Sequence, residues 1–147
     1  MVWGCFSSYG LGELVVLPKN IRVNTNVYYE LLNDHLPGCF ELCQIGVFNR
    51  TVQHLTLLVV QWLWDCQVPF IEDWFGNSQD INPIENLWGI VKKDLQGKNV
   101  SSIPWLEAAI RESWNKIPAA TVCNLALSLP RCLCSVIKKK SGPIKYY

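Results

Sequence analysis

The sequence predicts an α/β fold that ends in a group of helices. Short apolar segments alternate with helical patterns up to Asn82, and three further helical patterns follow. The 147 residues suit about one ordinary domain; 50% of them are hydrophobic and 17% are charged. This composition is far from that of a disordered chain, which is rich in charge and poor in apolar groups.

The N-terminal segment is typical of a β-hairpin. Residues 2–8 and 13–17 are short apolar or aromatic runs on either side of Gly10 and Gly12. Two such runs separated by a glycine-containing turn pair as antiparallel strands. We therefore expect a hairpin at the start of the chain.

A helix is expected next. Asn24, Thr25 and Asn26 can each cap a helix N-terminus, and Pro37 with Gly38 is predicted to end it. Its apolar face comprises Tyr28, Leu31, Leu32 and Leu36. The elements expected after it are a short buried strand at Ile45–Phe48, a helix at Leu55–Cys66 and a second short strand at Val68–Ile71.

The clearest helix start is at Asn82, which can cap a helix whose first position suits Pro83. Gly97 is expected to end this helix, because glycine commonly follows the last helical residue. Its apolar stripe comprises Ile84, Leu87, Trp88, Val91 and Leu95.

Two more helices complete the predicted fold. Ser102 begins the first and Pro118 closes it; the second begins near Ala119 and is interrupted at Pro130. The inward residues of the first are Ile103, Leu106, Ile110, Trp114 and Ile117, and the second ends in Lys138, Lys139 and Lys140. We expect the helices after Asn82 to be the best-formed part of the chain.

The net charge of +1 conceals a strong asymmetry along the chain. Residues 1–91 carry three basic and nine acidic side chains, a net charge of −6, whereas residues 92–147 carry ten and three, a net charge of +7. Such polarity is typical of chains that contact a polyanion such as nucleic acid. The alternative is that the charges form two solvated helix faces and a basic tail.

The cysteines do not predict a disulfide framework. Their number is odd, and the first residues, Met1–Gly4, show no pattern of a secretory signal. Cys132 and Cys134, with His35 and His54 far away in the sequence, do not match a zinc-site spacing. We expect buried free thiols. The seven positions are Cys5, Cys39, Cys43, Cys66, Cys123, Cys132 and Cys134.

No segment predicts a membrane span. The longest apolar run, Leu55–Trp64, is shorter than the roughly 18 residues that a span requires, and Thr56 and Gln61 interrupt it. The chain is therefore expected to be neither secreted nor inserted in a membrane.

One segment carries a specific motif. Residues 73–89 read Asp-Trp-Phe-Gly-Asn-Ser-Gln-Asp-Ile-Asn-Pro-Ile-Glu-Asn-Leu-Trp-Gly. This run resembles the third catalytic block of Tc/mariner superfamily transposases, in the Tc-like branch with an Asp-Asp-Glu catalytic triad. Phe75 and Gln79 stand where that family usually has proline, and Cys132 and Cys134 where it usually has arginine.

The resemblance implies a ribonuclease-H-like fold that cuts and joins DNA. Residues 1–6 look like the second strand of that fold, so the chain resembles an N-terminally truncated copy whose first central strand, with its Asp, is missing. Residues 1–97 would form a partial catalytic domain, and residues 98–147 a C-terminal helical extension with a basic tail. The family's role in DNA integration implies a nuclear location, with the cytoplasm as the other possibility.

The resemblance assigns Glu85 to the third catalytic carboxylate, with Gly89 and Lys92 on the same side of the helix. The second carboxylate should precede it by 34 intervening residues, and that position holds Arg50. Intact family members bind two magnesium ions with three carboxylates. Here Glu85 is a vestigial ligand, and we expect no cofactor to bind well. The alternative role of Glu85 is a capping box with Asn82.

These features predict a transposase remnant, a pseudoenzyme with at most weak, non-specific DNA binding. The expected DNA contacts are Lys92, Lys93, Lys138, Lys139 and Lys140. Glycine-rich phosphate loops and arrangements of Ser, His and acid are missing, so no other enzyme class competes. The alternatives are a protein-interaction module that binds a transposase or itself, and a decayed reading frame without function.

Our hypothesis for the loss of the second carboxylate is a pair of frameshifts in a decayed transposon copy. Codons can be chosen for residues 48–57 that, shifted by one base, encode Gln-Gln-Asp-Ser-Ala-Thr-Pro-His-Thr, close to the family pattern. The family match resumes at Val59, so a second shift would restore the frame. Sequencing the gene tests this hypothesis: we expect those codons at 48–57, and any other synonymous set would exclude it.

Overall fold

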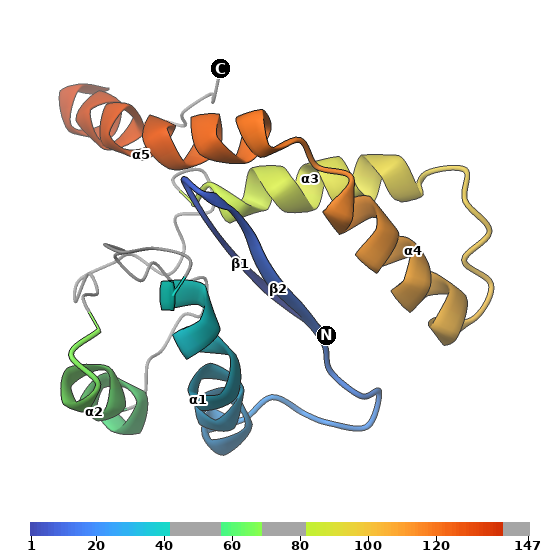
Figure 1. The fold of residues 1–147 in the computed structure, drawn as a ribbon, viewed down its shortest axis with the longest axis horizontal. Coiled ribbons are helices and arrows are strands. Elements are labelled where there is room, and N and C mark those ends of the chain that lie inside the picture. The colour runs from blue at the N-terminus through green and yellow to red at the C-terminus, as the bar shows by residue number, and fades with distance from the viewer. Residues whose placement is uncertain (42–56, 69–81, 140–147) are drawn as a thin grey trace.

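The computed structural model describes residues 1–41, 57–68 and 82–139 and contains two strands and five helices within them (Figure 1). The elements are β1 (Val2–Ser7), β2 (Gly10–Val16), α1 (Thr25–Glu41), α2 (Leu57–Asp65), α3 (Ile84–Leu95), α4 (Ile103–Asn115) and α5 (Ala119–Lys139). The predicted mixture of strands and helices is confirmed. None of the helices in these ranges has the length and apolarity to cross a membrane.

The two strands form the expected antiparallel hairpin. Val2 pairs with Val16 and Ser7 pairs with Gly10, and the register shifts between Gly4 and Phe6. Helix α1 lies on one side of the hairpin and α3 and α4 lie on the other, while α5 runs across its end (Figure 1). The hairpin is therefore the wall between two groups of helices.

Alternation along the strands divides the apolar side chains between two cores, because successive residues of a strand point to opposite faces. Trp3 and Val15 pack on the core formed by α1 and α2, whose fully buried members include Leu32 and Leu63. The core formed by α3, α4 and α5 takes Val2, Phe6, Leu11 and Leu14 from the hairpin and Leu87, Val91, Trp114, Ile117 and Val122 from the helices.

Trp114 fixes the helical group to the hairpin. Its side chain is 1% exposed, and its Nε1–H donates to the Gly12 carbonyl oxygen at 3.3 Å. The indole stacks on Trp88 with 5.0 Å between ring centroids. A Cβ at Gly4 would lie 3.2 Å from both indoles, so the glycine allows the rings to approach the strand.

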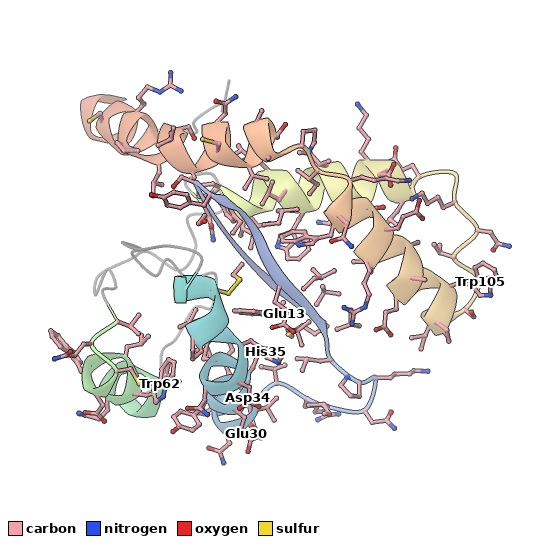
Figure 2. All side chains as sticks on the ribbon, viewed as in Figure 1. Glu13, Glu30, Asp34, His35, Trp62 and Trp105 are labelled. Atoms are coloured by element: carbon pink, nitrogen blue, oxygen red, sulfur yellow. A yellow bond between two sulfur atoms is a disulfide. The ribbon has the colours of Figure 1, made fainter. Side chains whose placement is uncertain are left out.

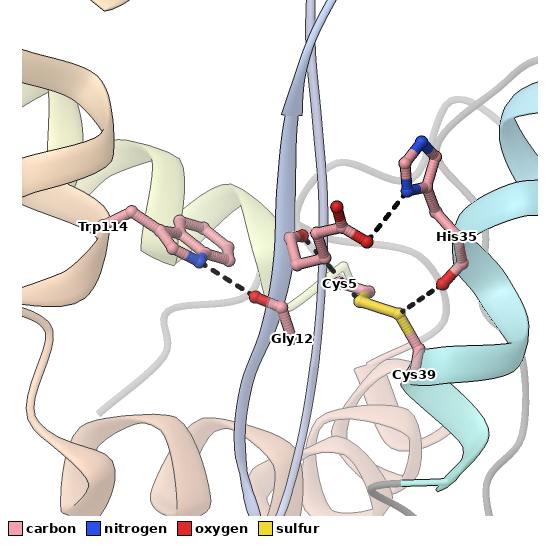
Figure 3. The surroundings of a disulfide bond; sticks show 6 residues. Cys5, Gly12, His35, Cys39 and Trp114 are labelled. Atoms are coloured by element: carbon pink, nitrogen blue, oxygen red, sulfur yellow. Dashed lines mark hydrogen bonds and ion pairs between the residues drawn. A yellow bond between two sulfur atoms is a disulfide. The ribbon is translucent and has the colours of Figure 1, made fainter. Parts of the chain in front are cut away.

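A disulfide joins the hairpin to α1 on the opposite face. Cys5 and Cys39, 34 residues apart in sequence, are bonded to each other, and Figure 3 shows the bond beside Gly12. A Cβ at Gly12 would lie 2.2 Å from the Cys5 Sγ, so only glycine leaves room for the bond. The same contact region holds the His35 Nδ1, 2.8 Å from the Glu13 Oε2.

The expectation of buried free thiols was wrong for this pair. The number of cysteines does not reveal that β1 and the end of α1 lie close together. In the folded chain the Cα atoms of the two bonded cysteines are 6.6 Å apart. Among the remaining described cysteines, only Cys132 is buried; Cys66 and Cys134 are exposed. Cys43 lies outside the described residues.

Polar contacts dock α4 against the end of α3 and against β2. The buried Ser113 hydroxyl donates to Asp94, which also accepts from the Lys98 Nζ at 2.7 Å. The hydrogen bond from Lys98 holds the pKa of Asp94 below its usual value and raises the pKa of Lys98. The Arg111 Nη1 donates to the Leu14 carbonyl at 2.9 Å.

Most of the predicted helix boundaries are confirmed. Asn24 caps α1 by accepting from the Val27 N–H at 3.0 Å, and Ser102 caps α4 by accepting from the Trp105 N–H at 3.4 Å. Gly97 follows α3 with φ +88°, a left-handed conformation that favours glycine. At α3 the N-cap is Pro83, one residue later than expected, although the Asn82 Oδ1 still accepts from the Ile84 N–H at 3.4 Å.

Three helix predictions were wrong. Pro37 lies inside α1, which continues to Glu41, and α5 passes through Pro130 without a break. A proline removes one backbone hydrogen bond and introduces crowding; at Pro37 the buried Leu36 and the disulfide at Cys39 hold the chain in helix on both sides. Ile103 is 50% exposed because it begins α4, where the helix extends past the core.

The expected strands at Ile45–Phe48 and Val68–Ile71 cannot be compared with the fold. The first lies outside the described residues, and so does the second apart from Val68, which belongs to no strand. Within the described ranges the sheet has the two strands of the hairpin.

The disulfide gives a stability prediction. Cys39→Ser is expected to lower the free energy of unfolding by about 3–4 kcal/mol in oxidising buffer, because the bond restricts the unfolded chain. Urea denaturation followed by tryptophan fluorescence measures the difference. Cys66→Ser, at an exposed free cysteine, is the matched control and is expected to behave like the parent chain. Equal stability of the parent and Cys39→Ser would contradict the assigned bond.

Candidate nucleic-acid interface

The outward side of α3 brings together the charged residues that the sequence motif singles out. The helix buries Leu87 and Val91, and residues three or four apart share a helix face. Glu85, Gly89, Lys92, Lys93 and Gln96 therefore form one stripe away from the core, which we call the outer stripe of α3. Glu85 is half-buried and the other four residues are exposed. The structure thus places the predicted Glu85 and two of the predicted lysines on one face of α3, about two turns apart.

Glu85 has no structural partner within the described chain. Its backbone N–H donates to the Asn82 carbonyl at 3.1 Å, but its carboxylate makes no hydrogen bond or ion pair with any described residue. The capping-box alternative requires that carboxylate to bond back to the Asn82 N–H, and the described residues contain no such bond. A negative side chain in the first turn still suits the positive end of the helix dipole.

Lys92 and Lys93 differ from the other cations of α3 and α4 and their connecting segment. Lys98 and Arg111 each have a carboxylate oxygen within 4 Å, at 2.7 and 2.9 Å, and Lys116 pairs with Glu112. Lys92 and Lys93 form no ion pair with a described residue, and both are exposed. Their charges suit the negative end of the helix dipole, and no carboxylate of the described residues neutralises either ammonium group.

Only some of the other residues that the sequence predicts for the interface lie in the described part of the chain. Lys138 and Lys139 are the last two residues of α5, at the opposite end of that helix from α4. Lys140 lies outside the described residues, and so does Arg50, which occupies the position expected for the second carboxylate. Of the motif at residues 73–89, only residues 82–89 are described.

The described residues do not fit a two-magnesium centre. Magnesium prefers several oxygen ligands in near-octahedral geometry, and Glu85 supplies one carboxylate. No group of three or more His, Cys, Asp or Glu side chains in the described ranges lies close enough to hold a metal ion. We therefore derive no catalytic step through magnesium.

A second surface feature lies at the start of α4. Trp105 is 67% exposed and Ile103 is 50% exposed, and Val100 precedes them in the connection from α3. Figure 2 shows Trp105 at the end of α4 that points away from the hairpin. We call Val100, Ile103 and Trp105 the α4 apolar patch. The spacing of apolar residues predicted that Ile103 faces inward. Such spacing identifies the apolar face of a helix, but it does not show where along the helix the core ends.

His35 contacts a carboxylate of the hairpin. The His35 Nδ1 of α1 lies 2.8 Å from the Glu13 Oε2 of β2, and the His35 side chain is 27% exposed. Figure 2 shows the two residues near each other. His54 lies outside the described residues.

Comparison with known proteins shows that the chain is similar to transposases. No family profile matches the chain. The chain is 32% identical to the Transposable element Tcb1 transposase of Caenorhabditis briggsae, over 99% of the chain and 54% of that protein. It is 36% identical to the Transposable element Tc3 transposase of Caenorhabditis elegans, over 99% of the chain and 45% of that protein, and 29% identical to the Tc1 transposase of the same organism. The chain spans about half the length of the curated relatives it matches.

Proposed function

The chain is a homologue of Tc1/Tc3-type transposases, and from this premise we propose that it contacts the DNA backbone without cutting DNA. The observation that carries the proposal is the pair of exposed lysines about two turns beyond Glu85 on the outer stripe of α3, neither of which has an ion-pair partner among the described residues. A DNA-related role also fits the charge of the chain, which is +7 over residues 92–147. The proposed location is the nucleus or the cytoplasm.

The proposed fold is part of a ribonuclease-H-like domain. Its support is the hairpin, which is covered by α1 on one side and by α3 and α4 on the other (Figure 1). Residues 98–147 are proposed as the C-terminal extension of that domain. Trp114 and Val122 from this extension share a core with Leu87 and Leu14, so the extension supports α3 directly.

The absence of cleavage follows from the charge of the site. Two magnesium ions carry four positive charges, and Glu85 opposes them with one negative charge. The position assigned to a second carboxylate holds Arg50. A unit-charge pair at 4 Å is worth about 4 kcal/mol at an effective dielectric near 20. Reversing the sign of one ligand against a divalent ion loses several times that, so metal binding in the family arrangement fails.

Binding through the outer stripe is expected to be weak and strongly dependent on salt. Each phosphate neutralised by a lysine releases condensed counterions from DNA. Two such contacts give a slope of about −1.8 in log affinity against log salt. Contacts of this kind do not read base sequence, so the expected binding is non-specific.

A DNA-binding assay tests the proposal. Fluorescence anisotropy of a labelled duplex should give an affinity that falls about tenfold between about 50 and about 200 mM KCl. Lys92→Ala with Lys93→Ala is expected to remove this binding. Lys19→Ala with Arg22→Ala removes the same charge from exposed positions in the N-terminal half and is the matched control. Absence of binding by the parent chain at low salt would contradict the proposal.

The same preparation tests the absence of cleavage. With magnesium present, a supercoiled plasmid is expected to stay intact. Nicking by the parent chain that disappears in Glu85→Gln would show an active carboxylate site and overturn this part of the proposal. Loss of nicking in Glu85→Gln is the required control, because a contaminating nuclease would act with either variant.

The second candidate function is self-association through the α4 apolar patch. Ile103 and Trp105 expose large apolar side chains in the first turn of α4, and exposed apolar patches often mark protein contacts. Size-exclusion chromatography with light scattering is expected to give a dimer mass for the parent chain and a monomer mass for Trp105→Ser. Tyr9→Ser, at a 73% exposed position in the hairpin turn, is the control. A monomeric parent chain at high concentration would contradict this candidate.

A further inference from the structure

The last turn of α1 has a local sequence that is unfavourable for a helix. Pro37 lacks the N–H that a helix needs and crowds the preceding turn, and the residue that follows it, Gly38, is a poor helix former. The residue before a proline also disfavours helical backbone angles. These local effects would end the helix near Leu36, whereas α1 continues to Glu41. A contact with another part of the chain must therefore hold the last turn in helical form.

The disulfide between Cys5 and Cys39 supplies such a contact. The helix as far as Leu36 is held by the core, because this side chain is 2% exposed. The next two residues, Pro37 and Gly38, are exposed, and the half-buried Cys39 follows them, bonded to β1 (Figure 3). The covalent bond thus lies beyond the proline, after the last residue of α1 that the structure shows as buried.

The disulfide is not enclosed in either core. Both cysteines are half-buried, and they line a small cavity together with Phe6, Ser7, Gly10 and Gly12 of the hairpin. Part of each cysteine is therefore open to solvent, where a small thiol can approach it. Small thiols keep most cysteines reduced in the nucleus and the cytoplasm, the location proposed for this chain, and disulfides that form there are usually catalytic or redox-sensing.

We propose that the Cys5–Cys39 bond is a redox switch that determines where α1 ends. While the bond is intact, residues 37–41 stay helical; when a small thiol of the glutathione class reduces it, they leave the helix and α1 ends near Leu36. In the first step one thiolate forms a mixed disulfide with one cysteine, and the other cysteine leaves as a thiolate and takes up a proton. A second thiolate then attacks the small-thiol sulfur of the mixed disulfide and releases the remaining cysteine, which also takes up a proton. The chain gains two electrons and two protons, and two small thiols become one disulfide.

The rest of the fold is expected to persist on reduction. Helix α1 keeps the fully buried Leu32 in the core on which Trp3 and Val15 of the hairpin also pack. The opposite group of helices is attached to the hairpin independently, through the indole of Trp114. Reduction is therefore expected to lower the stability of the chain but to release one turn rather than the whole helix.

Amide hydrogen exchange of the full chain in oxidised and in reduced glutathione tests the switch, with alkylation and mass spectrometry to identify the free thiols. On reduction, the amides of residues 38–41 are expected to lose their protection and to exchange as in an unstructured peptide, while those of residues 103–115 in α4 stay protected. Cys5→Ser and Cys39→Ser are expected to lack protection at residues 38–41 in both buffers. Cys66→Ser, at an exposed free cysteine, is the matched control and is expected to respond like the parent chain.

A rescue variant separates the switch from a general loss of stability. Pro37→Ala with Gly38→Ala gives the last turn of α1 favourable helix formers, so residues 38–41 are expected to stay protected even in reduced glutathione.

The proposal fails if Cys5 and Cys39 are both alkylated in oxidised glutathione, because the bond then does not form. It also fails if residues 38–41 keep the same protection in both buffers, or if reduction removes protection along the whole chain. Loss of protection in the rescue variant would show that the proline and the glycine do not determine the end of the helix, and would overturn the proposal as well.

Discussion

The packing of the hairpin between two helical groups depends on Gly12. Its carbonyl accepts the Trp114 indole N–H from one side, and its missing side chain makes room for the Cys5–Cys39 bond on the other. Gly4 performs a related role by admitting Trp88 and Trp114 to the strand. A larger residue at position 12 would displace the sulfur atom and disturb both attachments at once. The position of α3, and with it the outer stripe, thus follows from a close approach that glycine permits.

Local patterns in the sequence predicted the elements well where local physics decides them. Asn24 and Ser102 accept the backbone bonds expected of helix caps, and Gly97 has the positive φ expected after a helix. Pro37 misled because burial of its neighbour and a covalent bond from another element override its local effect. The disulfide itself was beyond prediction, because a spacing of 34 residues carries no information about which elements meet.

The sequence predicted only part of the candidate nucleic-acid interface, because local patterns again reveal only local geometry. Helical spacing was enough to place Glu85 and Lys92 on one face of α3. The sequence did not show which cations are neutralised by neighbours, because Lys98 meets Asp94 within four residues but also Glu112 from the next helix. Pairing and exposure are three-dimensional properties, and they separate the free lysines from the structural ones.

The contacts of the hairpin with α4 have a consequence for how the chain folds during synthesis. Trp114 lies 102 residues after Gly12, and Arg111 lies 97 residues after Leu14. Contacts between residues so distant in sequence slow folding, because a long loop must close before they form. The ribosome completes the hairpin before α4, and one face of the hairpin stays without its native cover until α4 has emerged. Exposed strands of this kind are where nascent chains aggregate, so the order of the elements leaves this face of the hairpin open to aggregation until α4 packs on it.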